Sequence, residues 1–257
     1  MMGPLRFSIV VPTLNQAAYL RQALASLAAQ DYPHKEIIVI DGGSDDASLQ
    51  VIQDYAPYLS YWSSEADQGQ TDALVKGFAR ATGDIWSWLN ADDLYFPDTL
   101  SRVAAFFRRR PQAQVVYGDA VWIDAAGRRI GVKKEVPFVP WLWWYDHNYI
   151  PQAATFWRRE LYEAVGGLDR RLSLAMDADL WWRFAQRTEF CHLPEFLAQI
   201  RRHAAQRTVL FQRDSDAEFA ALRRRYRGGE PPWQSGTKRL LASGCRRIWK
   251  WFRGGYR

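Results

Sequence analysis

The sequence predicts an α/β domain with a Rossmann-like, mostly parallel sheet flanked by helices, followed by a basic, amphipathic C-terminal extension. Two patterns indicate this class. Between residues 6 and 110, short apolar runs typical of buried strands alternate with segments whose apolar residues recur at helical spacing. After residue 205, basic residues dominate. A chain of 257 residues, 48% hydrophobic and 24% charged, is long enough to bury a sizeable core.

The first half of the chain predicts strand–helix repeats. Its strand segments are rich in Val and Ile, and Pro12 stops the first of them. Ser44 is expected to cap the helix that follows the second strand. The expected strands are 6–13, 35–41, 59–65, 84–90 and 114–124, and the expected helices are 15–30, 45–56, 71–82 and 97–110.

After Asp124 the alternation changes. The glycine-containing segment 125–135 predicts a hairpin, and 137–152 predicts an aromatic loop. Further along, 158–165 and 177–187 have helical spacing, whereas 189–203 reads as extended. Gly and Pro residues at 227–236 predict a linker before a short basic segment.

Charge is unevenly distributed along the chain. Residues 200–257 contain 15 Lys/Arg and 4 Asp/Glu, a net charge of +11; because the whole chain carries +6, residues 1–199 carry −5. Such a basic end is expected to bind an anionic surface, which could be nucleic acid or acidic lipid. The two cysteines, Cys191 and Cys245, exclude a disulfide framework and a cysteine zinc site. Without a signal-peptide core or a spanning apolar run, a cytoplasmic location is expected.

The 13 tryptophans are many for this length. Aromatic enrichment is typical of sugar-stacking or membrane-interface proteins, but a large aromatic core explains it equally. The cluster 141–147, "WLWWYDH", is open in the same way between core and an acceptor-binding loop.

Polar side chains end two of the predicted strands. Asp41 ends the second, and Asn90, Asp92 and Asp93 end the fourth. Ligands of open α/β sheets lie beyond the carboxyl ends of the strands, so both groups are expected at one crevice. Clustered carboxylates there suit a hard cation such as Mg²⁺ or Mn²⁺ that shares a diphosphate, although Asp92 and Asp93 could instead cap the next helix. Neither a GxGxxG nor a Walker pattern is present.

Seven motifs occur in order along the chain. They are "VVPTLN", "IIVIDGGSDD", "SEADQGQTDALVKGFARATGD", "WLNADD", "GGLD", "DADLWWR" and "IRRH". Together they resemble the GT-A glycosyltransferases of family 2, which are inverting enzymes that use nucleotide sugars. The resemblance covers roughly residues 6–205 and implies a GT-A domain at 1–205. Its nucleotide-sugar half would span about 1–124 and its acceptor half about 125–205, with 206–257 as the basic extension.

The resemblance implies roles for individual residues. Pro12, Thr13, Leu14 and Asn15 would rim the nucleotide pocket, and Asp41 would hydrogen-bond the base. Asn90 and Asp92 stand at the family's Asp-x-Asp, with Asp92 as the preferred direct metal ligand and Asp93 beside it as a further metal ligand. Asp177 matches the general base, with Asp179 and Arg183 as structural companions, although a surface ion pair between those two explains their spacing as well. His203 would contact metal or diphosphate, and Asp67 is a further donor-site candidate.

Three positions depart from the family pattern. Asn90 replaces the usual first aspartate, Met176 stands where an acid commonly precedes the base, and Val75 stands where close relatives have Asn. Asp92 and Asp177 are retained. Inverting transfer needs a base on the acceptor hydroxyl and stabilisation of the leaving diphosphate, and these two carboxylates are candidates for those tasks.

The expected function is therefore transfer of a sugar from a UDP-activated donor to a hydroxyl of a glycan or lipid-linked acceptor, with inversion and with Mn²⁺ or Mg²⁺. One alternative is a nucleotidyltransferase or sugar-nucleotide phosphohydrolase using the same metal-bound diphosphate. Another is a nucleic-acid-binding protein led by its basic tail. The tail cannot explain the acidic site, so nucleic acid is not expected as a partner.

The C-terminal segment 237–253 predicts an amphipathic helix. Leu240, Leu241, Gly244, Cys245, Ile248, Trp251 and Phe252 share one arc, and Arg239, Arg246, Arg247, Lys250 and Arg253 lie opposite. This pattern favours a helix on an anionic membrane surface, which would make the protein peripheral on the inner face of the cytoplasmic membrane. The alternative is a helix packed on the domain.

Overall fold

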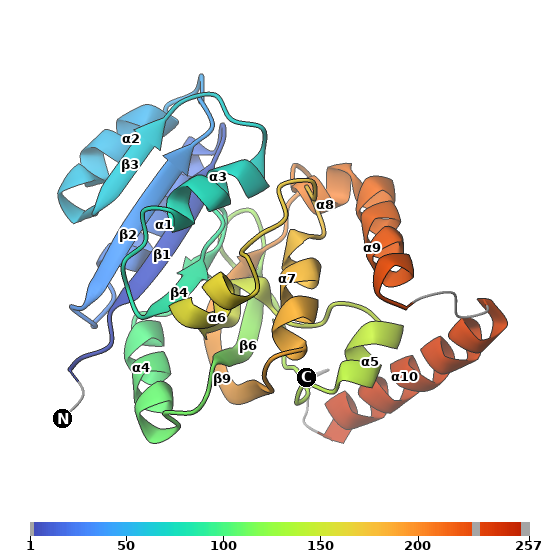
Figure 1. The fold of residues 1–257 in the computed structure, drawn as a ribbon. Coiled ribbons are helices and arrows are strands. Elements are labelled where there is room, and N and C mark those ends of the chain that lie inside the picture. Colours follow the sequence, from blue (N-terminus) through green and yellow to red (C-terminus); the bar gives the residue numbers. More distant parts are fainter. Residues whose placement is uncertain (1–2, 228–231, 253–257) are drawn as a thin grey trace.

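The computed structural model describes residues 3–227 and 232–252 and has the predicted α/β architecture (Figure 1). In its N-terminal half, four strands run parallel in the spatial order β3-β2-β1-β4. The strands are β1 (Phe7–Thr13), β2 (Lys35–Asp41), β3 (Tyr61–Ser64) and β4 (Ile85–Trp88). The helices between them are α1 (Ala17–Ala28), α2 (Ser48–Tyr55), the short η1 (Ala56–Tyr58) and α3 (Gln70–Phe78).

The same sheet continues through the second half of the chain. Within the described residues, eight of its nine strands follow the order β3-β2-β1-β4-β8-β6-β9-β5, and the ninth, β7, pairs with β6. The hairpin predicted at 125–135 was partly right, because that segment supplies the turn and β7 while β6 is the other strand. β6 and β9 run in the direction of β1–β4, whereas β5, β7 and β8 run against it. The elements are β5 (Leu94–Tyr95), α4 (Thr99–Arg109), β6 (Val115–Ile123), β7 (Arg129–Lys133), α5 (Pro140–Tyr145), η2 (Gln152–Ala154), β8 (Thr155–Arg158), α6 (Arg159–Ala164), α7 (Met176–Ala185) and β9 (Phe190–Arg201).

Two apolar layers cover the sheet, one on each face. Along β1, Phe7, Ile9 and Val11 face the layer under α1, α2 and α4, whereas Val10 faces the layer under α3, α6 and α7. This alternation follows from the period of two along a strand. α3 approaches β1 so closely at Gly77 that an added Cβ would lie 2.3 Å from Val10. The "LVKGF" segment therefore needs its glycine for packing.

The aromatic residues mainly build the core. In the layer under α3, α6 and α7, the indoles of Trp88 and Trp181 stack with centroids 5.8 Å apart, and Trp157 packs against both. Trp143 and Trp144 also belong to this layer, so the cluster 141–147 is largely core. The prediction of a loop over 137–152 was partly wrong, because "PWLWWY" forms the short helix α5, with Pro140 at its first turn.

The C-terminal extension contains α8 (Arg207–Leu210), α9 (Gln212–Arg227) and α10 (Pro232–Phe252). α9 was not predicted. The linker prediction falls partly on residues 228–231, which lie outside the described residues. It was wrong for the rest, because Arg227 ends α9 and residues 232–236 begin α10. The predicted amphipathic helix therefore begins earlier than expected, and Arg253 lies outside the described residues. None of the described helices combines the length and apolarity needed to cross a bilayer.

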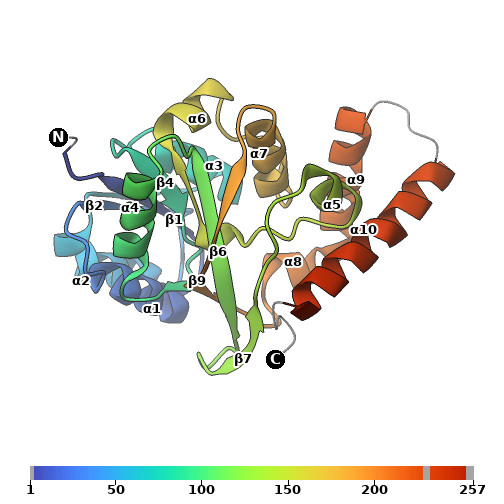
Figure 2. The same cartoon turned by 90° about the horizontal axis from the view of Figure 1, so that it is seen from below.

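α10 packs on the domain beside α5 (Figures 1 and 2). It contacts the domain through residues spaced four apart, of which Ala242 and Arg246 are buried. Arg246 pairs with Asp146, and Lys250 Nζ lies 2.7 Å from Glu135 Oε1. The polar side of the predicted helix is thus divided, because Arg246 and Lys250 face the domain while Arg239 and Arg247 are exposed.

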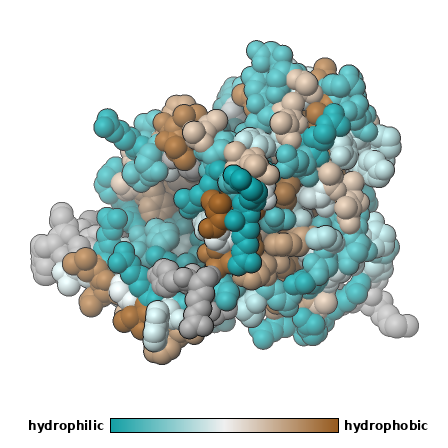
Figure 3. All heavy atoms as spheres, turned by 180° about the vertical axis from the view of Figure 1, so that it is seen from behind, coloured by the Kyte–Doolittle hydropathy of each residue, from teal (hydrophilic) through white to brown (hydrophobic). Residues whose placement is uncertain are grey.

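The apolar arc of α10 faces away from the domain. Leu240 is 78% exposed, Trp251 68% and Phe252 75%. Figure 3 shows hydrophobic residues gathered along the edge of the molecule where α10 lies. Helices of globular proteins usually bury the apolar face and expose the charged one, and α10 does the reverse. It therefore packs on the domain and leaves an apolar face unpartnered among the described residues.

Candidate active site

A cavity of about 840 Å³ opens at the carboxyl ends of β1 and β4, and we call it the strand-end cavity. Loops from distant parts of the chain line it, because parallel strands deliver their following loops to one edge. Eight sequence-predicted residues lie in its wall: Pro12, Thr13, Leu14, Asn15, Asp67, Asn90, Asp92 and His203. Sequence reasoning missed other lining residues, among them Tyr19, Gln70 and Arg207.

Hydrogen bonds between two loops shape the rim of this cavity. Asn15 adopts φ 53°, a left-handed conformation that Asn tolerates better than most residues. Its Oδ1 accepts the Asp45 N–H at 2.9 Å, and its own N–H donates to Ser44 Oγ at 2.8 Å. The prediction that Ser44 caps α2 was wrong, because α2 begins only at Ser48 and Ser44 instead joins the two loops.

Asp41 does not line the strand-end cavity. Its buried carboxylate accepts hydrogen bonds from the Ser44 N–H at 3.0 Å, the Ser44 hydroxyl at 2.5 Å and the Ser64 hydroxyl at 2.6 Å. In this arrangement Asp41 holds the loop after β2 against the end of β3. A contact between Asp41 and a nucleotide base stays a prediction.

Asp92 and His203 come together in the strand-end cavity. The imidazole Nε2 of His203 lies 3.0 Å from Asp92 Oδ2, although the two residues are 111 positions apart. The buried Arg201 aligns them, since its Nε donates to the Asp92 carbonyl at 2.8 Å and its guanidinium carbon lies 4.7 Å from the centre of the Tyr19 ring. The Tyr19 ring in turn lies against the His203 ring. Arg201 lies within the "IRRH" motif, but no sequence signal indicates this role.

Asp93 points away from this pair. Its Oδ1 accepts the Arg201 N–H at 3.0 Å, and it lines a different cavity. Burial, with the neighbouring Asp92 carboxylate, raises the pKa of Asp93 well above its usual range. The structure thus brings Asp92 and His203 together and leaves Asp93 outside the pair.

The Asp92–His203 pair fits a divalent cation that takes the rest of its ligands elsewhere. No group of three or more ligating side chains occurs within residues 3–227 and 232–252. Two protein ligands facing an open cavity suit an ion whose remaining positions are filled by diphosphate oxygens and water. A carboxylate oxygen with an imidazole nitrogen favours Mn²⁺ over Mg²⁺, which prefers oxygen ligands alone.

A second cavity of about 720 Å³ contains Asp177, and we call it the Asp177 cavity. Asp177 lies in the first turn of α7, after the N-cap residue Ala175, so it does not cap the helix. Its Oδ2 accepts the Asn148 amide at 2.8 Å, and its Oδ1 accepts the Ala178 N–H at 2.7 Å. Burial raises the pKa of Asp177 to about 6, and these two hydrogen bonds limit the rise.

The orientation of the Asn148 amide is fixed by a tryptophan. The indole N–H of Trp143, which can only donate, lies 3.0 Å from Asn148 Oδ1. The amide nitrogen of Asn148 is therefore the end that meets Asp177. Asn148 was missed by sequence reasoning, and no sequence signal marks it, because 29 residues separate it from Asp177.

Asp177 makes a pH-dependent contribution to stability. Its pKa is about 6 in the folded protein and about 3.9 in an unfolded chain, so the folded state retains a proton between these values. The stabilisation is fully present below about pH 4 and is lost as the pH rises through about 6. Asp177→Asn, which cannot ionise, should gain roughly 3 kcal/mol relative to the wild type between about pH 4 and 7. Urea denaturation of both proteins measures this gain, and a difference independent of pH would contradict it.

The two cavities adjoin. Gln70, Asn90, Gln206 and Arg207 line both of them. Gln70 Nε2 donates to Asn90 Oδ1 at 2.8 Å, so these two side chains form part of the partition. A molecule in the strand-end cavity and another in the Asp177 cavity would therefore meet near Asn90.

Asp179 and Arg183 support the site from behind and line neither cavity. Arg183 donates to Asp179 at 2.6 Å and to the carbonyls of Val165 and Gly167 at 2.8 and 2.6 Å. The Tyr226 hydroxyl of α9 donates to the other Asp179 oxygen at 2.6 Å. This pair therefore fixes the "GGLD" turn against α7 and is more than a surface ion pair.

The mostly parallel sheet, with helices on both faces and a cavity at its strand ends, has the GT-A fold of glycosyltransferases. The chain belongs to glycosyl transferase family 2, whose model matches residues 8–166. A PGL/p-HBAD biosynthesis glycosyltransferase of Mycobacterium bovis (strain BCG / Pasteur 1173P2) is 36% identical over 177 residues, 67% of each chain. An uncharacterized glycosyltransferase of Rickettsia typhi (strain ATCC VR-144 / Wilmington) is 29% identical over 212 residues, covering 78% of this chain and 65% of its own.

Solved structures share the fold. TarS 1-349 of S. aureus in complex with UDP-GlcNAc matches with a TM-score of 0.65 and 21% identity, over 79% of this chain and 60% of that one. The chain thus spans less than two thirds of that structure. The mannosyltransferase PcManGT of Pyrobaculum calidifontis, in complex with GDP-Man and Mn²⁺, matches with a TM-score of 0.66 and 20% identity, over 94% of this chain and 70% of that one.

Proposed function

We propose that this family 2 glycosyltransferase moves a sugar, with inversion, from a UDP-activated donor to a hydroxyl of a glycan or lipid-linked acceptor. One observation carries the proposal. A cavity with the Asp92–His203 pair adjoins a cavity with an isolated, buried carboxylate, Asp177, and the two share a wall at Asn90. Donor and acceptor would occupy one cavity each.

The donor occupies the strand-end cavity in this proposal. Pro12, Thr13, Leu14 and Asn15 rim the nucleotide, with Asp67 and Asn90 on the sugar side. Asp92 and His203 hold Mn²⁺ or Mg²⁺ against the diphosphate, and the bound cation would neutralise the charge that develops on the leaving group. Complexes of TarS with UDP-GlcNAc and of PcManGT with GDP-Man and Mn²⁺ support this choice of ligands.

Asp177 is the general base in this proposal. The acceptor oxygen attacks the anomeric carbon from the face opposite the diphosphate. The new carbon–oxygen bond forms as the bond to the β-phosphate breaks, and the acceptor proton passes to Asp177. A pKa of about 6 is suited to this role, because the carboxylate is ionised at neutral pH yet more basic than an exposed aspartate. Asn148 keeps one oxygen of Asp177 occupied, which directs the carboxylate.

A screen of nucleotide sugars tests the donor assignment. UDP-sugars with Mn²⁺ should raise the melting temperature, and GDP-sugars or Mn²⁺ alone should raise it less, because a ligand stabilises the state that binds it. Stabilisation by GDP-sugars alone would show that the donor nucleotide contains guanine and not uracil. If no nucleotide sugar stabilises the protein, the assignment of the strand-end cavity to the donor is wrong.

The outward apolar face of α10 supports docking on an anionic membrane. Leu240, Ile248 and Trp251 are exposed, and Arg239 and Arg247 on the same helix are available to acidic headgroups. Burying one large apolar side chain contributes roughly 1.5–3 kcal/mol, and each basic residue near anionic lipid adds about 1 kcal/mol.

Replacing two apolar residues of α10 should release the protein from membranes. Leu240→Glu with Trp251→Glu is expected to weaken binding to phosphatidylglycerol-containing liposomes at least about 100-fold in a flotation assay, since two anchors are lost. Ile130→Glu, at a similarly exposed apolar position on β7, is the control and should bind normally. Full binding by the double variant would eliminate α10 as the contact.

A further inference from the structure

α10 also forms part of the wall of the Asp177 cavity. Lys250 reaches this cavity from α10, and Lys133 reaches it from the end of β7. Both ammonium groups contact the same oxygen, Glu135 Oε1, at 2.7 Å for Lys250 and 2.8 Å for Lys133. Glu135 is fully buried, and the two lysine side chains are 12% and 14% exposed. Two cations that share one carboxylate leave a net positive charge at this wall.

Other cationic groups surround the same cavity. Arg202 and Arg207 also line it. The guanidinium of Arg202 lies 3.9 Å from the centre of the Trp122 ring, and Lys133 Nζ lies 5.9 Å from that centre. Of the acids in the wall, Glu135 contacts the two lysines, and Asp93 accepts the Arg201 backbone N–H at 3.0 Å. Asp177, the third acid, contacts Asn148 and Ala178 instead, so this wall holds four Lys and Arg side chains against three acids.

The lysines retain capacity for another acceptor of hydrogen bonds. An ammonium group has three N–H donors. Lys133 uses two, on Glu135 and on the Tyr149 carbonyl at 2.8 Å, and Lys250 uses one on Glu135 among the described residues. A phosphate oxygen in the cavity could take the remaining donors. Burial raises the strength of such charge-assisted hydrogen bonds.

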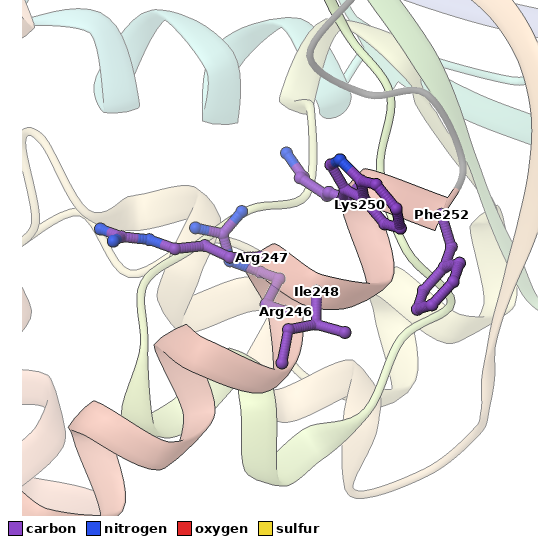
Figure 4. A pocket seen from close by; sticks show the side chains of 6 residues that line it. Arg246, Arg247, Ile248, Lys250 and Phe252 are labelled. Carbon is purple, nitrogen blue, oxygen red and sulfur yellow. The ribbon is translucent and has the colours of Figure 1, made fainter.

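Lys250 also lines a second, open hollow at the end of α10, with a volume of about 830 Å³. Ile248, Trp251 and Phe252 share this hollow with Arg246 and Arg247. Figure 4 shows Lys250 extending from one side of the helix and Ile248 and Phe252 from the other. Lys250 therefore borders both the Asp177 cavity and the apolar end of α10.

We propose that the acceptor carries a phosphate group near the accepted hydroxyl, and that Lys133 and Lys250 bind this phosphate in the Asp177 cavity. This inference rests on the proposed function, since it assigns that cavity to the acceptor. The phosphate could belong to a soluble sugar phosphate or to a lipid-linked one. In the second case its hydrocarbon would leave over Trp251 and Phe252.

Calorimetry on the full chain tests the phosphate site with two probes, a hexose 6-phosphate and the uncharged methyl glycoside of the same hexose. UDP and Mn²⁺ are kept saturating so that the probe cannot enter the strand-end cavity. The phosphate probe should bind at least about tenfold tighter than the glycoside. Lys133→Met and Lys250→Met should each remove most of this preference, whereas Lys250→Arg should keep it. Arg239→Met, on the exposed side of α10, should have no effect.

Glu135→Gln separates a binding role from a structural one. Removing the shared counter-charge should tighten phosphate binding severalfold, because both lysines then present their full charge. If the lysines served only to anchor α10, Glu135→Gln would not strengthen binding and the phosphate probe would bind no better than the glycoside. Either result overturns the inference. Failure of UDP to bind in the same samples would instead overturn the proposed function.

A dodecyl phosphate probe identifies the source of the phosphate. If the acceptor is lipid-linked, this probe should outcompete the hexose phosphate, and Trp251→Ser should remove its advantage. Competition that depends only on the phosphate and not on the alkyl chain would identify a soluble acceptor.

Discussion

Asp177→Asn is expected to lower turnover at least about 100-fold while the affinities for UDP and Mn²⁺ stay unchanged. General base catalysis typically contributes 10²- to 10⁴-fold, and an amide cannot accept the proton. Asp177 lines the Asp177 cavity and not the strand-end cavity, so donor binding should be unaffected. Steady-state release of UDP, with calorimetric binding of UDP, measures both quantities.

The control for this variant is Asp54→Asn. Asp54 lies on α2, has a side chain that is 39% exposed and paired with Arg21, and lines neither cavity. It should retain normal turnover. Near-normal turnover by Asp177→Asn would show that another group deprotonates the acceptor.

Asp92→Ala is expected to abolish the stabilisation that Mn²⁺ adds to UDP. At a ligand concentration about 100 times the dissociation constant, binding adds about 2.7 kcal/mol, which for a chain of this size raises the melting temperature by roughly 5–10 °C. Asp92 supplies the oxygen beside His203 Nε2, so its removal leaves a single protein ligand. Thermal melts with UDP, with and without Mn²⁺, measure the loss.

Asp93→Asn is the matched control for the metal assignment. The neighbouring carboxylate of Asp93 points to the Arg201 backbone, and an amide oxygen can accept the same hydrogen bond. This variant should keep its response to Mn²⁺. An equal loss in both variants would mean that Asp93 also binds the cation, as the sequence pattern suggested.

The strands and helices of the domain were predictable because their signals are local. β-branched runs predicted β1 and β2, and stripes at helical spacing predicted α1 and α4. α9 was missed because half of its 16 residues are charged, and individual polar contacts hold it to the domain. Glu218 of α9, for example, accepts the N–H groups of Leu174 and Ala175, both at 2.9 Å. No periodic pattern reveals such contacts.

The site could be predicted only as a set of residues, not as an arrangement. Asp92 and Asp93 are neighbours in sequence, yet one points to His203 and the other to Arg201, because both lie in the turn between β4 and β5, closed by the Asp93 N–H on the Asn90 carbonyl. Asp41 ends its strand as expected, but its carboxylate accepts hydrogen bonds from the hydroxyls of Ser44 and Ser64. Both outcomes depend on tertiary neighbours.

α10 could also be predicted only in part from the sequence. Its amphipathic arc could be read from the sequence, but the side that meets the domain could not. Asp146 and Glu135 accept Arg246 and Lys250 from positions about 100 residues away, and these ion pairs turn the charged side inward. Lys133 and Lys250 likewise meet in the Asp177 cavity only because the fold brings α10 to the end of β7, where both contact Glu135.

The most direct test of transfer is the release of UDP from UDP-sugars by the full chain with Mn²⁺, measured with and without a hydroxyl-bearing acceptor fraction. Family membership and the adjoining cavities predict that UDP release depends on the acceptor and that the labelled sugar appears in the acceptor in equal amount. Release of UDP at the same rate without any acceptor, with the sugar recovered free in water, would contradict this account and identify hydrolysis.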